Sequence, residues 1–315
     1  MSGNLFDEVL WKIKILVNRT EFAMNDKLRY PFFYPDTFYK FTKMFRKERE
    51  AQKILHDFCF DTLNRRRAII EKKKFCNNNE GEDNSIDRNI LIDHLILNEE
   101  KFTKTEIRDH FLTFVSGYET WANALAHAML LLAMHPEVQE KLFEEINQTF
   151  ETKTDLENSE VVNNMQYLEM VQKEIFRLLP AVPLIVRNNL EEFEMEPGLV
   201  IPPKQNLAIN FFALHRRKNI WGEDADKFNP DRFLAENSTN RHPFSFLPFS
   251  SGSRICIGFK YSNISLKIAM IKLIQSFKFK TSMKLEEIRL KSYISLKLCT
   301  KHLMSAELRE RTKTD

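Results

Sequence analysis

The chain has 315 residues, enough for one large domain or two ordinary ones with a substantial buried core. Its net charge is only +3 at pH 7, with acidic and basic residues mixed throughout, so no nucleic-acid partner is expected. Four cysteines without CxxC spacing exclude a disulfide framework and a zinc site, and no apolar run of about 18 residues is present to span a bilayer.

Helical periodicity dominates the first half of the chain, and the few glycines (7) and few β-branched runs also favour helices over a many-stranded sheet. The start lacks the basic flank and cleavage site of a signal peptide. A basic run, Arg65–Arg67 followed by Lys72–Lys74, is expected on a solvated helix face, and residues 75–89 read as a polar surface linker. Helices are predicted over residues 5–17, 37–74, 105–134, 137–150, 161–179 and 261–277.

After Pro180 the sequence changes to prolines and short apolar stretches, which predict small strands and turns. Further short strands are expected at residues 278–281 and 293–299, followed by a polar tail at 306–315. The predicted fold class is therefore mainly α with a minor β-sheet: helix-rich over 1–180 and mixed strand and loop over 181–300.

The segment LPFSSGSRICIGFK, residues 247–260, places one cysteine in a tight loop bracketed by glycines. Cys256 lies just before a predicted helix, whose free N–H groups favour a thiolate, the form of cysteine that binds metals. Gly252 and Gly258 permit sharp turns and close approach to a flat cofactor, and Arg254 offers a fork for a carboxylate. The alternative from the residues alone is a buried structural cysteine in a turn.

The spacing of Phe249, Gly252, Arg254, Cys256 and Gly258 resembles the haem-binding loop of the cytochrome P-450 family, the haem-thiolate monooxygenases. The resemblance implies that these residues bind haem b, with Cys256 as the axial thiolate ligand of the iron. It also implies that Arg254 pairs with a haem propionate.

Glu174 and Arg177 share one face of a predicted helix, which in most proteins is only a surface ion pair. Here they resemble the ExxR pair of the same family, and FNPDRF (residues 228–233) resembles its PERF segment. The resemblance implies a buried structural triad of Glu174, Arg177 and Arg232 that supports the cysteine loop. Such a triad is costly unless it is fully hydrogen-bonded.

The long helix contains FVSGYETW, residues 114–121, similar to the oxygen-binding groove of the family. The resemblance implies that Gly117 lies at the cofactor, that Thr120 hydrogen-bonds the oxygen on the iron, and that Glu119 helps to relay protons. Trp121 departs from the small hydroxyl residue usual there and is expected to crowd the helix or narrow the pocket. The alternative is a buried helix with a packing glycine.

Two further features complete the resemblance. Arg187, in VPLIVR, is implied to reach a haem propionate, and Ser116 stands where a related branch has the glutamate that esterifies haem, so a non-covalent haem is expected. Residues 1–315 are expected to form a single domain of this fold that lacks the N-terminal third and its membrane anchor. The closest resemblance is to the family-four clan, particularly its insect members.

The expected function is insertion of one oxygen atom from O2 into an apolar lipid or xenobiotic. Electrons would come from NADPH through NADPH–cytochrome P-450 reductase, with cytochrome b-five as a second donor, on the cytosolic face of the endoplasmic reticulum membrane. The alternatives are a catalytically incompetent or unstable haem-binding fragment, and an isomerase or peroxide-driven enzyme. The substrate is not indicated by the sequence.

Overall fold

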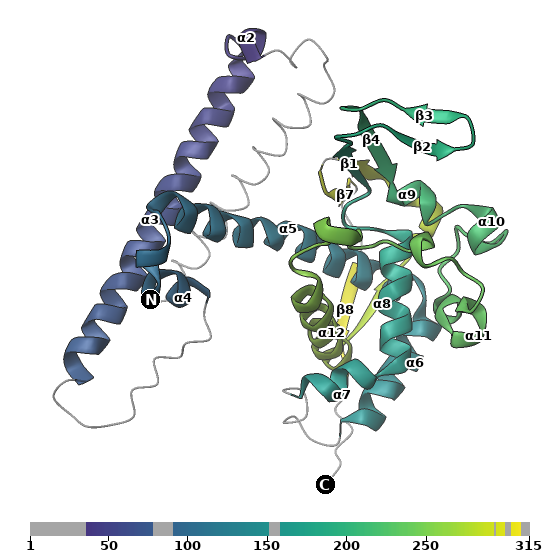
Figure 1. Ribbon diagram of the computed structural model, residues 1–315. Coiled ribbons are helices and arrows are strands. Elements are labelled where there is room, and N and C mark those ends of the chain that lie inside the picture. Colours follow the sequence, from purple (N-terminus) through teal and green to yellow (C-terminus); the bar gives the residue numbers. More distant parts are fainter. Residues whose placement is uncertain (1–35, 78–90, 151–157, 293, 300–303, 310–315) are drawn as a thin grey trace. The chain divides into compact units, whose positions relative to one another are not determined.

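The computed structural model describes residues 36–77, 91–150, 158–292, 294–299 and 304–309 (Figure 1). The described residues fall into two compact units, divided between Glu119 and Thr120. The single domain expected over residues 1–315 therefore stays a prediction. The helix expected at residues 5–17 and most of the expected linker at 75–89 lie outside the described residues.

The first unit is helical. It contains α2 (Asp36–Tyr39), α3 (Lys43–Asn77), α4 (Leu91–Leu97), a 3-10 turn (Glu99–Lys101) and the start of α5 (Lys104–Met134). The helix expected over 37–74 is wrong at its start, because the chain leaves α2 at Tyr39 and Thr42 caps α3 by accepting the N–H of Phe45 at 3.1 Å. Its small core consists of Cys59, Leu63, Ile70, Leu95, Ile96 and Ile107.

The sequence predicted that the basic run of α3 lies on a solvated face, but one of its arginines is bound to a buried carboxylate. Arg66 forms a two-pronged ion pair with Asp93, whose side chain is fully buried, with both N–O distances at 2.7 Å. Arg65 pairs with Asp61 within the helix. Arg66 is thus partly buried against α4, whereas the Arg65–Asp61 pair faces solvent, as the sequence predicted.

The second unit has a core of helices that pack against one another (Figure 1). They are the end of α5, α6 (Pro136–Thr149), α7 (Ser159–Asn164), α8 (Gln166–Leu178) and α12 (Phe259–Ser276). α8 is buried along most of its length, although it carries Glu174 and Arg177. Charged side chains in such a helix require partners on the chain around it.

The helix expected over 161–179 is wrong as one element, because it breaks at Met165, where the backbone is extended. The cause lies in another helix. The Glu145 carboxylate of α6 accepts the N–H groups of Tyr167 and Leu168 at 2.7 and 2.8 Å and so caps the N-terminus of α8.

Four two-stranded antiparallel sheets lie among the described residues. The pairs are β1 (Leu184–Asn188) with β4 (Asn206–Asn210), β2 (Phe193–Glu196) with β3 (Leu199–Ile201), β5 (Phe277–Thr281) with β8 (Met304–Leu308), and β6 (Leu290–Ser292) with β7 (Leu296–Leu298). The polar tail expected from residue 306 is therefore wrong for 306–308, which pair with β5.

Between β4 and α12 the chain forms only short turns. They are α9 (Phe211–Leu214), α10 (Lys218–Trp221), a 3-10 turn (Pro230–Phe233), α11 (Ala235–Ser238) and 3-10 turns at Pro243–Ser245 and Gly252–Arg254. A further 3-10 turn spans Leu285–Glu287. Among the described helices, none is long and apolar enough to cross a membrane.

Candidate functional site

The cysteine loop, residues 247–258, is shaped by its own backbone. Ser250 and Gly252 adopt positive φ angles of 65° and 74°. The chain doubles back, and the Cys256 N–H donates to the Phe249 carbonyl at 3.0 Å. Space does not require glycine at position 252, because an added Cβ would meet no atom within 4 Å. The left-handed backbone does require it, because other residues rarely adopt that conformation.

The Cys256 side chain is exposed and precedes α12, as the sequence predicted. The helix start does not act as expected on its sulfur. The N–H of Phe259 donates to the Cys256 carbonyl at 3.2 Å and that of Ser262 to the Gly258 carbonyl at 2.7 Å. Within the described part of the chain no N–H donates to the Cys256 Sγ.

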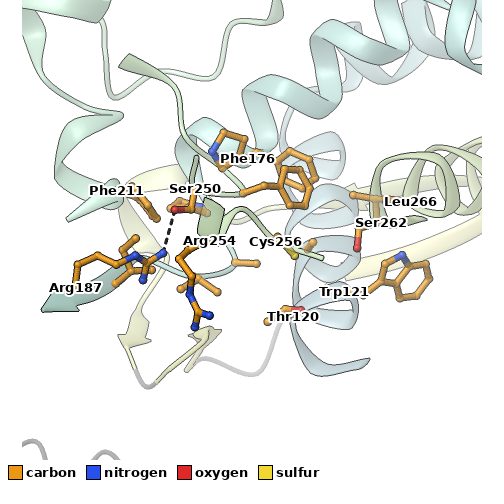
Figure 2. A pocket seen from close by; sticks show the side chains of 17 residues that line it. Thr120, Trp121, Phe176, Arg187, Phe211, Ser250, Arg254, Cys256, Ser262 and Leu266 are labelled. Atoms are coloured by element: carbon orange, nitrogen blue, oxygen red, sulfur yellow. Dashed lines mark hydrogen bonds between the residues drawn. The ribbon is translucent and has the colours of Figure 1, made fainter. Parts of the chain in front are cut away.

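Cys256 borders a cavity of about 260 Å³ that lies wholly in the second unit (Figure 2). Most of its lining is apolar, and the polar exceptions are a thiol, two guanidinium groups and a few hydroxyls. The lining residues are Thr120, Trp121, Ala124, Phe176, Pro180, Ala181, Val182, Ile185, Arg187, Phe211, Pro248, Phe249, Ser250, Arg254, Cys256, Ser262 and Leu266.

The two arginines of the cavity are held differently. Arg187, on β1, donates to Ser250 Oγ at 3.3 Å and to the Val186 carbonyl at 3.1 Å, and Figure 2 shows its bond to Ser250. Arg254 is exposed, and no hydrogen bond or ion pair engages its guanidinium among the described residues. Two cations beside an apolar cavity suit a ligand that is flat, largely apolar and doubly anionic.

α5 contributes Thr120, Trp121 and Ala124 to the cavity wall. Glu119 and Gly117 do not line it; Gly117 is exposed, and a Cβ added there would meet nothing within 4 Å. The packing-glycine alternative therefore has no support at Gly117. The Trp121 Nε1 donates to Ser265 Oγ of α12 at 3.0 Å, and the residue borders the cavity. The crowding or narrowing expected from Trp121 stays a prediction.

Glu174 and Arg177 are fully buried and joined by two hydrogen bonds of 2.6 and 2.8 Å. The Arg177 guanidinium also donates to three backbone carbonyls, those of His215, Ala225 and Lys227, at 2.8, 2.6 and 2.9 Å. Glu174 additionally accepts the N–H of Asn229 at 2.8 Å. This one pair therefore fixes the whole stretch from α9 to the segment at 228–233.

Arg232 lies with this pair but bonds elsewhere. Its Nε is 3.6 Å from Glu174 Oε1, while its Nη atoms donate to the carbonyls of Trp221 and Asp224 at 2.7 and 2.6 Å. Arg232 also forms an ion pair of 2.6 Å with the Asp224 carboxylate. That contact holds the pKa of Asp224 below its usual range.

Two residues without a role in the sequence analysis belong to this region. Phe176 lies in α8 between Glu174 and Arg177, lines the cavity, and packs edge-on against Phe249 with ring centroids 5.3 Å apart. His215 is fully buried, and burial together with Arg177 and Arg216 lowers its pKa to about 3. The sequence analysis assigned no role to Phe176, and the long-range partner of His215 left no sequence signal.

Comparisons with known proteins agree with this geometry. The family model described as Cytochrome P450 matches residues 2–300 of the chain. "Probable cytochrome P450 313a4" of Drosophila melanogaster is 38% identical over 213 residues, covering 67% of this chain and 43% of that protein. "Cytochrome P450 4c21" of Blattella germanica is 30% identical over 295 residues, covering 92% of this chain and 58% of that protein.

"Probable cytochrome P450 4aa1" of Drosophila melanogaster is 36% identical over 251 residues, which are 78% of this chain and 47% of that protein. The chain spans about half the length of these curated relatives. The insect resemblance of the sequence and its mainly helical fold class with small sheets are both confirmed. The chain belongs to the cytochrome P450 family.

Proposed function

We propose that the chain is the haem-binding part of a haem-thiolate monooxygenase that inserts one oxygen atom from O2 into an apolar substrate. The observation that carries the proposal is the cavity beside Cys256, where one thiol and two guanidinium groups border apolar walls. These donors fit haem b: a thiolate for the iron, two cations for the propionates, and an apolar surface for the ring.

Each residue of the site then has a task. Cys256 would ligate the iron, and Gly252 gives the loop the turn that brings Cys256 back to Phe249. Arg187 and Arg254 hold the propionates without a covalent link to the cofactor. Gly258 caps α12 and, with Phe249 and Gly117, belongs to the proposed cofactor-binding set. When bound, haem supplies redox-active iron that activates O2, and thiolate ligation favours O–O cleavage.

Thr120 and Glu119 are proposed to move protons. The Thr120 side chain borders the cavity, where a hydroxyl both donates and accepts hydrogen bonds. Glu119 is the neighbouring carboxyl group on the same helix, α5, although it does not line the cavity. A carboxyl next to a hydroxyl is a suitable pair for general acid chemistry. The apolar walls limit water around the Thr120 hydroxyl.

The proposed partners follow from family membership. NADPH–cytochrome P-450 reductase supplies the electrons, cytochrome b-five is a second donor, and the substrate is a lipid or xenobiotic whose apolar surface suits the walls of the cavity. The proposed location is the cytosolic face of the endoplasmic reticulum membrane. The buried Glu174–Arg177 pair, with Arg232 beside it, is proposed to support the cysteine loop.

A second candidate is a chain that binds haem without turnover. The observation favouring it is Trp121, which stands on the cavity wall where the family usually has a small hydroxyl residue. The two candidates share the haem site and differ in NADPH-dependent product formation with reductase present.

The first test is the absorbance spectrum of the chain expressed with a haem supply, reduced and saturated with carbon monoxide. A strongly red-shifted Soret band that disappears in Cys256→Ala and persists in Cys299→Ala would support thiolate ligation through Cys256. Cys299 is a matched control because it is also exposed but does not line the cavity. Absence of the band in the unaltered chain would contradict the proposed haem site.

A further inference from the structure

His215 connects the start of the cysteine loop to the buried Glu174–Arg177 pair. We propose that His215 is a positioning residue for Cys256, because it fixes the first backbone N–H of the loop and is itself fixed by Arg177. The inference rests on the proposed role of Cys256 as haem ligand.

One end of the connection is the His215 ring. Its Nε2 accepts the backbone N–H of Leu247, the first residue of the cysteine loop, at 3.0 Å. From there the loop is held by its own bonds: Ser250 N–H to the Leu247 carbonyl at 3.2 Å, and Cys256 N–H to the Phe249 carbonyl at 3.0 Å. A shift at Leu247 is therefore passed to the cysteine within two hydrogen bonds.

The other end is the His215 backbone. Its carbonyl accepts from Arg177 Nη1 at 2.8 Å, and its N–H donates to the Phe211 carbonyl at 2.9 Å. Arg177 is fully buried in α8 and holds Glu174 with two hydrogen bonds. The histidine is thus anchored to the most buried helix of the unit, and the loop is anchored to the histidine.

Aromatic rings surround the imidazole. Its centroid is 5.3 Å from that of Phe246, 6.1 Å from that of Phe211, in a stacked arrangement, and 6.5 Å from that of Trp221. With Nε2 as acceptor, the hydrogen resides on Nδ1, and the ring must be neutral. Its lowered pKa, caused by burial and two nearby arginines, keeps it neutral at physiological pH.

A metal ligand depends on such outer contacts for its position. Loss of a group that orients a ligand typically lowers metal affinity by about 10- to 100-fold. Removing the His215 acceptor also leaves the Leu247 N–H without its partner at a part-buried position. We therefore expect the cysteine loop to open more often and the Cys256 sulfur to ligate the iron in a smaller fraction of molecules.

The test compares His215→Phe with Gln139→Leu by hydrogen exchange of the full chain without haem. Phenylalanine keeps an aromatic ring but has no acceptor. Gln139 is the matched control: it is fully buried in the same unit and bonds the carbonyls of Leu132 and Phe279 at 2.9 Å, away from the loop. His215→Phe should speed exchange of the amides of Leu247 and Cys256 at least tenfold relative to Gln139→Leu, with α8 unchanged. Equal exchange in both variants would overturn the proposal.

Two additions keep the outcome decisive. If His215→Phe fails to fold, two other variants replace it: His215→Gln supplies an acceptor oxygen, and His215→Leu does not. Amides of the cysteine loop should then exchange more slowly in His215→Gln than in His215→Leu. Equal exchange in these two variants would refute the inference. In haem-loaded protein, His215→Phe should lower the fraction of the carbon monoxide complex with the thiolate band, whereas Gln139→Leu should not. A missing band in the unaltered chain would count against the haem site alone, because the exchange result needs no haem.

Discussion

The indole Nε1 of Trp121 donates to the Oγ of Ser265 at 3.0 Å, joining α5 to α12 at the wall of the cavity. Trp121→Phe and Ser265→Ala should each lower the free energy of unfolding by about 1 kcal/mol. Because both remove the same bond, the double variant should cost less than the sum of the two. Urea unfolding of the four proteins gives the coupling energy, and strict additivity would mean that the bond contributes nothing.

The same indole should limit what the cavity admits. Trp121→Ala removes a large ring from the wall beside Thr120, so bulky apolar ligands should bind more tightly while small ones change little. Spectral titration of haem-loaded protein with a homologous series of apolar ligands measures this. Unchanged relative affinities along the series would show that Trp121 does not shape the ligand space.

Loss of the Arg177 side chain should be the most destabilising of the substitutions considered. It would leave Glu174 as an uncompensated buried carboxylate and remove the donor from three backbone carbonyls. Breaking a buried ion pair in this way costs about 3–5 kcal/mol. Arg177→Met should therefore lower the urea midpoint of unfolding far more than Arg254→Met does, because the Arg254 guanidinium has no partner among the described residues. Similar shifts would contradict the central role of Arg177.

Arg187 and Arg254 should control retention of haem more than stability of the chain. A hydrogen bond to a charged group contributes about 1.5–3 kcal/mol, which corresponds to at least about tenfold in affinity. Arg254→Ala should thus speed haem transfer to an acceptor protein tenfold or more with an unchanged unfolding curve. Arg254→Lys, which keeps the charge, should restore part of the retention. Unaltered transfer rates in both Arg187→Ala and Arg254→Ala would exclude propionate binding by these residues.

Thiol labelling should distinguish the cysteines. Burial raises the pKa of Cys59 to about 11, so at pH 8 roughly a thousandth of it is thiolate, and alkylation should be negligible in folded protein. Cys256 and Cys299 are exposed and should react. Haem should protect Cys256 and leave Cys299 reactive, as peptide mass mapping will show. Protection of both, or of neither, would contradict the cavity as the haem site.

His215 should make the second unit sensitive to acid. Its pKa falls from 6.5 to about 3 on folding, so the unfolded chain binds more protons between these values. The contribution of neutral His215 to the free energy of unfolding is complete above pH 6.5. Below that pH it falls by about 1.4 kcal/mol per pH unit. His215→Phe should have lower stability at pH 7.5 but a shallower decline towards pH 5. If urea unfolding shows the same loss of stability between pH 7.5 and pH 5 in the unaltered chain and in His215→Phe, this prediction is wrong.

Local signals in the sequence predicted much of the fold. Pro136 and Pro180 lie just beyond the observed ends of α5 and α8, and a helix was expected after the cysteine loop, where α12 begins. The break at Met165 was not predictable, because its cause is a carboxylate from another helix, Glu145. β8 was missed for a similar reason: its partner, β5, precedes it by a loop and two short strands.

For the site, sequence predicted residue types better than contacts. It selected Thr120, Arg187 and Cys256, which the fold brings to one cavity, but gave no indication that Leu247 would bond His215. It also predicted that helix N–H groups point at the sulfur, whereas the N–H of Phe259, the first residue of α12, donates to the Cys256 carbonyl. Pairings between distant segments depend on packing of the whole unit, which no local window contains.

The cavity draws its walls from α5, α8, β1, the cysteine loop and α12, so its first and last wall residues, Thr120 and Leu266, are far apart in the chain. During synthesis, a ribosome therefore releases the α5 wall long before the thiol appears. The cofactor has no complete site to enter until α12 has emerged and packed. On the proposed haem site, the cofactor is therefore bound only late in synthesis, and haem cannot complete the site of a nascent chain stalled before Cys256.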